Sequence, residues 1–317
     1  MSMPHFECNI NKIFRKLIFF SFLLFFGVQN CSAENSPDST TEFYQATAII
    51  NIDSIKLSKS GRYDMYCDYS GNLFILMEDQ NSILKLSEKG ALVEHIGGFG
   101  FGVRQFNAPV AMASSDGGLN LYILDSENRR VVRLTNSLKW IDQFEIGDEP
   151  GGKAIGELTG IAINSQKEVF ISDPRNLRII KFTKDGRFLE EIEGRSKFIE
   201  PGEIIIDDED YLYVANRNGK NLFLFDDLGN YIKRYSPETD DSIMAIVVDR
   251  SYFYYLDSRS NSVKVFSKKL AYLFEIVPQM NGDTEIVPAE ITSGRRGRIW
   301  LLDINNNRIY GYDPVEK

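Results

Sequence analysis

Three acidic residues at related places, Asp64, Glu203 and Glu290, are the side chains of this sequence whose grouping would carry chemistry. Each stands at the start of a short apolar segment, and the equivalent segments elsewhere begin with a small residue: Ala111, Gly160 and Ala245. Carboxylates about 6 Å apart repel by about 3 kcal/mol at an effective dielectric of about 20, so they share a proton or bind a cation. The sequence thus predicts a ligand site for a cation or a cationic group, with calcium as the metal that oxygen ligands suit. The alternative is that the carboxylates pair with arginines or face channel water.

Such a grouping requires elements that repeat around an axis, and the sequence contains a repeat. Each copy has a short apolar strand, an Asp-centred turn and a strand of alternating pattern. The clear copies are Leu121–Leu134, Val169–Phe182, Leu212–Phe225, Phe253–Phe266 and Ile299–Tyr312, and a weaker copy is Leu73–Leu86. The Asp position recurs at intervals of 48, 48, 43, 41 and 46 residues.

A further short strand precedes each copy and another follows most of them. Four strands per unit of roughly 45 residues are typical of a propeller blade. The sequence therefore predicts an all-β, six-bladed β-propeller over residues 43–317. The last unit lacks a fourth strand after Tyr312, whereas Phe43–Ile52 is a strand without a unit of its own. We expect this N-terminal strand to pair with Arg308–Tyr312 and close the ring, which would cover an open sheet edge.

The Asp-centred turns recur with an Asn three residues later at Asp125, Asp173 and Asp303. Short polar side chains that bond to their own backbone stabilise tight turns, so this recurrence indicates a structural role. An arginine follows each Asp by five residues: Arg130, Arg178 and Arg308. We expect these arginines to be solvated or paired with a neighbouring blade.

The segment Gly97–Ala113 (GGFGFGVRQFNAPVAMA) has the glycine content of a loop that folds over phosphates. A phosphate site of that kind requires a helix N-terminus behind the loop. Pro109 and an apolar strand follow instead. We interpret the loop as a crossover between blades, in which glycines permit the necessary backbone conformations.

Two other residues could do nucleophilic or metal chemistry, Cys67 and His95. Cys67 lies on an inner strand and His95 on the outer strand Ala91–Ile96, so the cysteine has no nearby base. A lone cysteine on a strand is typical of a small buried residue. A single histidine beyond the leader excludes a multi-histidine zinc or iron site.

The combination of a glycine-rich turn, QF-x-x-P, an apolar strand and L-Y-x-x-D-x-x-N-x-R resembles the NHL-repeat family of six-bladed β-propellers. The resemblance is sharpest over Gly97–Leu134 and Leu158–Gly186, and Met77 departs from it at the Asp position of the first unit. It implies a platform whose loops and channel mouths hold a partner. Propeller lyases of the peptide-amidating kind are similar in fold but depend on several histidines, which this sequence lacks.

Basic residues followed by the 12-residue apolar run Leu17–Val28 are typical of a signal peptide. The small residues Cys31-Ser32-Ala33 predict cleavage after Ala33, which makes residues 1–33 a signal peptide and residues 34–42 a flexible tether. A lipid anchor at Cys31 and an uncleaved membrane anchor stay open as alternatives. We expect an extracytoplasmic location: periplasmic, cell-surface or secreted.

Removal of the leader changes the net charge from −9 to −11. An acidic surface repels nucleic acid and anionic lipid. We therefore expect no nucleic-acid partner, and membrane contact only through an N-terminal anchor.

Together these features favour an exported, non-enzymatic binding or scaffold propeller that recognises a protein, peptide or glycan through its channel mouth and loops, with no cofactor. The alternative is a calcium-dependent hydrolase resembling the gluconolactonase and strictosidine-synthase-like propellers, whose metal lies on the axis. Asp64, Glu203 and Glu290 would supply carboxylates to such a metal, although the sequence shows no matched Asn and Asp partners deeper in the channel.

Overall fold

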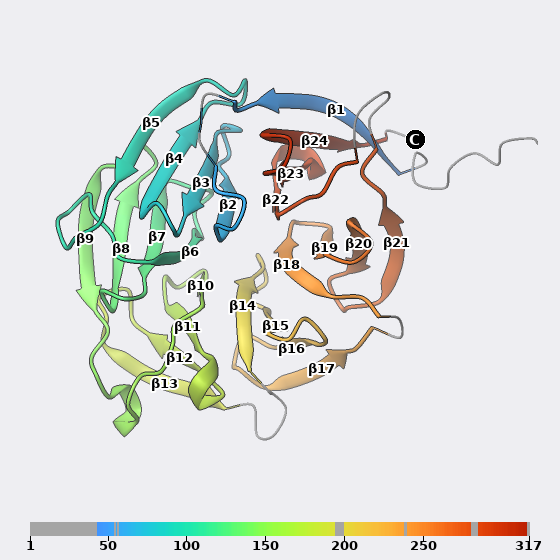
Figure 1. Cartoon of the computed structure of the whole chain (residues 1–317). Coiled ribbons are helices and arrows are strands. Elements are labelled where there is room, and N and C mark those ends of the chain that lie inside the picture. The colour runs from blue at the N-terminus through green and yellow to red at the C-terminus, as the bar shows by residue number, and fades with distance from the viewer. Residues whose placement is uncertain are drawn as a thin grey trace, which may run out of the picture. The chain divides into compact units, whose positions relative to one another are not determined.

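The computed structural model describes residues 43–53, 55, 57–193, 200–237, 240–279 and 285–315. These residues form six four-stranded antiparallel sheets arranged around one axis (Figure 1). The prediction of an all-β, six-bladed propeller is confirmed. The predicted signal peptide and tether, residues 1–42, lie outside the described residues. Within the described part of the chain, no helix is long and apolar enough to cross a membrane.

The first three sheets follow the chain in order. They consist of β2 (Tyr63–Cys67), β3 (Leu73–Met77), β4 (Ser82–Leu86) and β5 (Leu92–Gly97); β6 (Pro109–Ala113), β7 (Asn120–Asp125), β8 (Arg130–Thr135) and β9 (Trp140–Glu145); and β10 (Gly160–Ile163), β11 (Val169–Asp173), β12 (Arg178–Phe182) and β13 (Phe188–Glu193).

The next two sheets repeat this order, and the sixth takes its outer strand from the start of the described chain. They consist of β14 (Pro201–Ile206), β15 (Leu212–Asn216), β16 (Leu222–Phe225) and β17 (Tyr231–Tyr235); β18 (Ile243–Val248), β19 (Tyr252–Asp257), β20 (Ser262–Ser267) and β21 (Tyr272–Ile276); and β22 (Glu290–Ser293), β23 (Ile299–Asp303), β24 (Arg308–Pro314) and β1 (Tyr44–Asn51).

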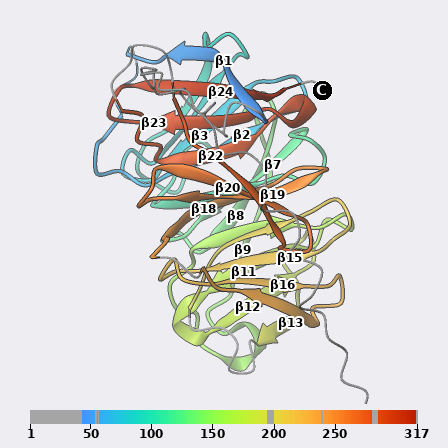
Figure 2. The ribbon, with the colours of Figure 1, turned by 90° about the vertical axis from the view of Figure 1, so that its right-hand side faces the viewer.

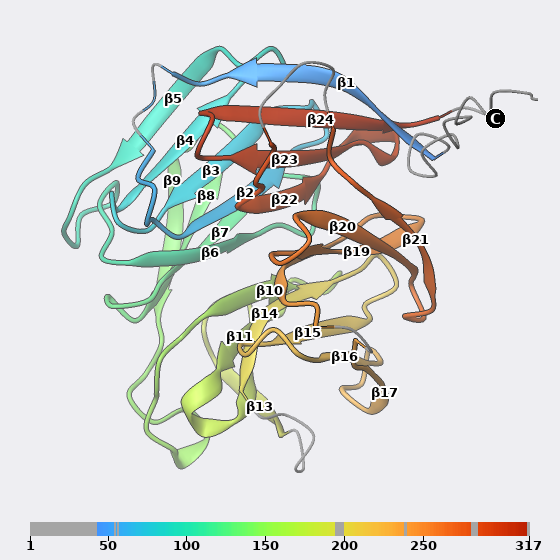
Figure 3. The same ribbon diagram turned by 45° about the vertical axis from the view of Figure 1, so that its right-hand side comes forward.

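The first strand of every sheet lies nearest the axis, and the fourth lies outside (Figure 1). Neighbouring first strands contact one another all the way round, from β2 through β6, β10, β14, β18 and β22 back to β2. The sheets are stacked face to face, as the side view and the oblique view show (Figures 2 and 3). Residues at the mouth-side ends of these six strands therefore converge although they are far apart in the chain.

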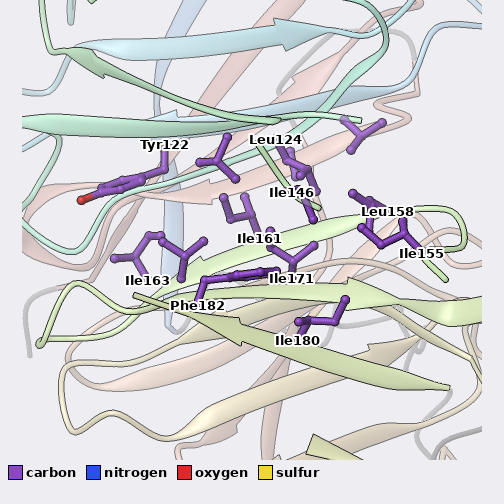
Figure 4. Packing of buried hydrophobic residues seen from close by; sticks show 14 residues of the cluster. Tyr122, Leu124, Ile146, Ile155, Leu158, Ile161, Ile163, Ile171, Ile180 and Phe182 are labelled. Atoms are coloured by element: carbon purple, nitrogen blue, oxygen red, sulfur yellow. The ribbon is translucent and has the colours of Figure 1, made fainter. Parts of the chain in front are cut away.

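Apolar side chains from adjacent sheets fill the space between them. Between the sheets of β6–β9 and β10–β13, for example, Leu124 and Tyr122 pack with Ile161, Ile171 and Phe182 (Figure 4). The second and third strands are buried on both faces, so they are almost continuously apolar, whereas the outer strands alternate with exposed residues. This packing holds the inner strands in fixed positions around the axis.

The sixth sheet joins the two ends of the described chain. Strand β1 pairs antiparallel with β24, with Ile50 opposite Ile309 and Tyr44 opposite Pro314. The Tyr44 hydroxyl also lies 3.0 Å from the Tyr254 hydroxyl in the fifth sheet. These contacts tie the first described strand to two sheets.

The Asp-centred turns are buried networks within one blade, and here the expectation for two arginines is wrong. Arg130 and Arg178 are 3% and 0% exposed, neither solvated nor paired across blades. Arg130 Nε donates to Asp125 Oδ2 at 2.7 Å, and Arg178 Nε donates to Asp173 Oδ2 at 3.1 Å. The turn brings the guanidinium close to the carboxylate, because the Asp ends one strand and the Arg begins the next, and the two residues lie opposite each other in the pairing of these strands.

Arg130 also fixes the glycine-rich loop. Its two terminal nitrogens donate to the main-chain oxygens of Phe101, Gly102 and Gln105. The N–H groups of Gly98 and Gly100 are bonded to other main-chain oxygens, and β6 rather than a helix follows the loop. The loop thus presents carbonyl oxygens to a cation, which is the opposite polarity of a phosphate cradle.

Candidate functional site

A cavity of about 410 Å³ opens at one mouth of the channel, and it is lined by all three of the acidic residues singled out from the sequence. Asp64 comes from β2, Glu203 from β14 and Glu290 from β22, which are first strands of three different sheets. The ring of first strands brings them together. A more open hollow of about 380 Å³ adjoins this cavity and shares Ser60, Gly61 and Arg62 with it.

Two of the carboxylates are held by the neighbouring sheet. Asp64 Oδ2 accepts a hydrogen bond from the main-chain N–H of Met112 on β6 at 2.6 Å, and Glu203 Oε2 accepts one from Ile246 on β18 at 3.0 Å. First strands leave their inward N–H groups without a strand partner, so these carboxylates satisfy them. Met112 follows Ala111 and Ile246 follows Ala245, and these small residues leave room for the incoming side chain.

Glu290 is positioned differently. The residue at the equivalent place on the next sheet is Asp64 rather than an alanine, and Glu290 Oε1 accepts the N–H of Ile291, its own neighbour, at 2.8 Å. The side chain is buried, with the residue 8% exposed. Three carboxyls from three sheets therefore share one desolvated space with few donors.

Burial and mutual repulsion disfavour the ionised forms of this acidic cluster, defined as Asp64, Glu203 and Glu290. Burial raises the pKa of Asp64 to about 6, against the hydrogen bond from Met112 and the charge of Arg62. Burial and the Asp64 charge raise the pKa of Glu203 to about 8. Burial, Glu203 and Asp64 raise the pKa of Glu290 well above its ordinary value. The cluster thus holds proton donors and a proton acceptor together near neutral pH.

Arg62 is a cavity residue that the sequence analysis missed. Its Nη2 donates to the main-chain oxygen of Thr159 at 3.0 Å, on the entry to β10 across the channel mouth. Its positive charge lowers the pKa of each member of the acidic cluster, although burial outweighs it. The available signal in the sequence was its position two residues before Asp64, because a residue that immediately precedes a first strand also lies at the channel mouth.

Asn216 and Met244 were missed as well. Asn216 ends β15 at the Asp position of the fourth repeat, and Met244 lies on β18 with 48% of its surface exposed. Both line the cavity. The replacement of the repeated Asp by Asn in one blade was the signal for Asn216, and Met244 had none.

The residues do not fit a calcium site. Among the described residues no group of three or more His, Cys, Asp or Glu side chains is placed to hold one metal ion. Main-chain N–H groups take one oxygen from each member of the acidic cluster, and the guanidinium of Arg62 lies close enough to act on all three. An arginine counter-charge competes with a divalent cation for the same carboxylates, so no chemistry at this site is derived through calcium.

The other sequence candidates lie away from the cavity. Cys67 is buried, and burial raises the pKa of its thiol to about 12, which keeps it protonated and unreactive. His95 is exposed on the outer strand β5. Both positions agree with the interpretation from sequence.

No family model matches the sequence, and no curated protein matches it. Solved structures do resemble it in fold. A streptogramin B lyase is 14% identical with a TM-score of 0.59, covering 88% of this chain and 100% of its own. Virginiamycin B lyase from Staphylococcus aureus is 13% identical with a TM-score of 0.61, covering 86% and 100%. A catalytically inactive variant of that lyase, in which alanine replaces a histidine, was solved with quinupristin and has a TM-score of 0.58 at 14% identity, covering 86% and 100%.

These neighbours correct the expected function. The non-enzymatic scaffold favoured from sequence is contradicted, because the similar propellers are enzymes. The expectation of an enzyme, held as the alternative, agrees better with them. Identities of 13–14% carry the fold and not the lyase reaction, and His95 lies on an outer strand rather than at the cavity. The cavity at the channel mouth is lined by carboxyl, guanidinium and carboxamide groups, together with Lys59, Ser60, Tyr63 and Thr159.

Proposed function

We propose that this protein is a propeller hydrolase that uses carboxyl groups as general acid and base at the channel mouth, without a bound calcium ion. The observation that carries the proposal is the convergence of Asp64, Glu203, Glu290 and Arg62 on one cavity. Paired carboxyls whose environments push their pKa values apart are the arrangement that acid–base hydrolysis requires.

Each residue takes a role that follows from its surroundings. Asp64, with the lowest pKa of the cluster, is ionised at pH 7 and accepts a proton from the attacking water. Glu203 holds its proton at that pH and donates it to the leaving group. Glu290 keeps its proton, because burial, Glu203 and Asp64 raise its pKa well above the ordinary value. Arg62 stabilises negative charge that develops on the substrate.

The test is a hydrolysis screen with the purified full chain on chromogenic esters, lactones and peptide anilides. Replacing Glu203 with Gln removes the proton donor and leaves the shape of the side chain, so we expect kcat to fall by about 10²–10⁴-fold. The matched control is Glu200→Gln, because Glu200 is exposed just before β14 and is not among the cavity-lining residues. Equal activity of the two variants would rule out the acid–base role.

The dependence of the rate on pH gives a second test on the same substrate. The rate should rise as Asp64 loses its proton near pH 6 and fall as Glu203 loses its proton near pH 8. A chelator should leave the rate unchanged. A rate that a chelator abolishes and calcium restores would contradict the metal-independent mechanism.

We further propose the setting in which this enzyme works. A signal peptide over residues 1–33 would export it, with a lipid anchor at Cys31 as the alternative, and residues 34–42 would tether the propeller. Residues 43–52 would close the ring in the mature protein, which the pairing of β1 with β24 supports. The NHL-type sequence pattern supports a common origin with that family of propellers. The acidic surface favours a polar, uncharged or cationic substrate rather than a nucleic acid.

A further inference from the structure

Asn216 has a side chain that nothing in the described structure satisfies. The residue is 2% exposed, and neither its amide nitrogen nor its amide oxygen has a hydrogen-bond partner. Its main chain is ordinary, with its N–H bonded to Asn221 and its carbonyl to Gly219. Buried polar groups are almost always paired. An unpaired carboxamide beside a cavity therefore indicates that its partner is a bound ligand rather than another part of the protein.

The equivalent side chains of the fifth and sixth blades are hydrogen-bonded. Asp257 accepts the N–H groups of Ser242 and Arg259, at 2.8 and 3.1 Å. Asp303 accepts those of Asn305 and Asn306, at 2.9 and 3.0 Å. In the fourth blade the repeat position carries Asn, and these turn bonds are absent from its described contacts. The fourth blade thus departs from the repeat in residue type and in bonding at the wall of the cavity.

The neighbours of Asn216 in the cavity define what it faces. Two of the residues that line the same space as Asn216 are Glu203 on β14, which belongs to the same sheet as Asn216, and Met244 on β18 of the next sheet. Met244 exposes 48% of its surface and offers an apolar contact. Tyr63 is the aromatic residue of this lining and is 6% exposed, so the lining offers no open aromatic face to a sugar ring.

We propose that the Asn216 carboxamide recognises an amide group of the substrate, and that the substrate is a peptide or peptide-like amide with an apolar side chain. A carboxamide has two N–H donors and one oxygen acceptor, which match the C=O and N–H of a second amide. A site that leaves polar groups unpaired until the substrate arrives discriminates strongly against analogues that lack the matching group. The statement that the bound amide is a substrate rests on the proposed hydrolase function, whereas the statement that Asn216 binds an amide does not.

Binding to the full chain tests it without turnover. The probes are N-acetyl-leucine methylamide and N-acetyl-leucine methyl ester, which differ in the terminal N–H, measured by calorimetry. We expect the methylamide to bind at least ten-fold more tightly than the ester. Asn216→Leu, which keeps the volume and removes donor and acceptor, should reduce methylamide affinity at least ten-fold and abolish the preference. Asn216→Asp keeps an acceptor for the terminal N–H but loses the donor to the C=O, so it should retain the preference for the methylamide while binding both probes more weakly.

The melting temperature separates recognition from a structural role. Asn216→Leu removes an unpaired polar group, so the free variant should melt at the same temperature as the parent or higher. The matched control is Asp257→Leu, which removes the paired side chain of the fifth blade and should melt several degrees lower. An Asn216→Leu variant that melts as low as this control, or an unchanged preference for the methylamide, would overturn the proposal.

The same variants distinguish this inference from the proposed hydrolase. Glu203→Gln should retain methylamide binding while losing turnover. Methylamide binding that depends on Asn216 in a protein without hydrolase activity would keep the inference and refute the proposed function. Hydrolysis that depends on Glu203 but is unchanged by Asn216→Leu would support the proposed function and refute the role of Asn216.

Discussion

Two sets of buried carboxylates in this molecule meet opposite surroundings. In the second blade Asp125 is 0% exposed and receives hydrogen bonds from Asn107 N–H, Asn128 Nδ2 and Arg130 Nε. At the channel mouth Arg62 acts on Asp64, Glu203 and Glu290, and the described hydrogen bonds to these three carboxylates come from main-chain N–H groups. Burial raises the pKa of Asp125 too, but three direct donors, one a guanidinium, oppose it.

The difference teaches what a buried acid is for in this fold. At the turn both oxygens of Asp125 accept hydrogen bonds, from a main-chain N–H, a carboxamide and a guanidinium, so the acid and its arginine hold a loop in place. At the channel mouth the carboxyl groups have fewer donors, so their pKa values rise toward neutral pH, and they lie beside an open cavity. Burial is common to both, and the number of donors separates the acid that holds a loop from the acids that we propose exchange a proton.

The largest effect should come from breaking the turn. Arg130→Met leaves Asp125 buried without its guanidinium and frees the glycine-rich loop, so we expect a loss of about 3–5 kcal/mol in the free energy of unfolding. Urea titration measures it. The control is Arg129→Met, because Arg129 makes an exposed ion pair with Asp148 and should cost about 0–1 kcal/mol. Equal losses would remove the distinction between the two arginines.

A smaller effect of opposite sign should come from the mouth. The pKa of Glu203 is about 8 in the folded protein against an ordinary 4.5, so the folded state binds the proton more tightly than the unfolded state. That contribution to stability is complete below pH 4.5 and is lost as the pH rises to about 8. Gln mimics the protonated acid at every pH.

The measurement is the difference in unfolding free energy between Glu203→Gln and the parent. It should be smallest below pH 4.5 and favour the variant increasingly up to pH 8, with about 1.4 kcal/mol per unit of pKa shift as the upper bound. Glu200→Gln, which alters an exposed acid outside the cavity lining, is the control for the substitution itself. A flat profile for Glu203→Gln would mean that the mouth carboxylates titrate normally.

The smallest expected effect concerns the glycine-rich loop. Its carbonyl oxygens are committed to Arg130, so millimolar ATP or NAD should leave the melting temperature unchanged. Gly100→Ala introduces a side chain at φ +148°, where Cβ would lie 2.5 Å from Gln105 Oε1, and should cost stability without touching nucleotide affinity. Nucleotide binding that this substitution abolishes would restore a phosphate role to the loop.

The sequence by itself determined the repeat and therefore the fold. Alternation of apolar residues and the recurring Asp turn are local patterns, and each repeat position reports its own strand and face. The same logic placed Asp64, Glu203 and Glu290 at one channel mouth, because equivalent positions in a ring converge. It also placed Cys67 in the interior and His95 on an outer strand.

Only the tertiary structure decided which partners those side chains meet. Arg62 reaches Thr159, 97 positions away, and Asp64 bonds the N–H of Met112, 48 positions away. The burial of Arg130 and the unpaired amide of Asn216 depend on how a turn folds back and on what a neighbouring blade presents. Hydrogen bonds act over about 3 Å, so they depend on packing between segments that no periodicity in one segment encodes.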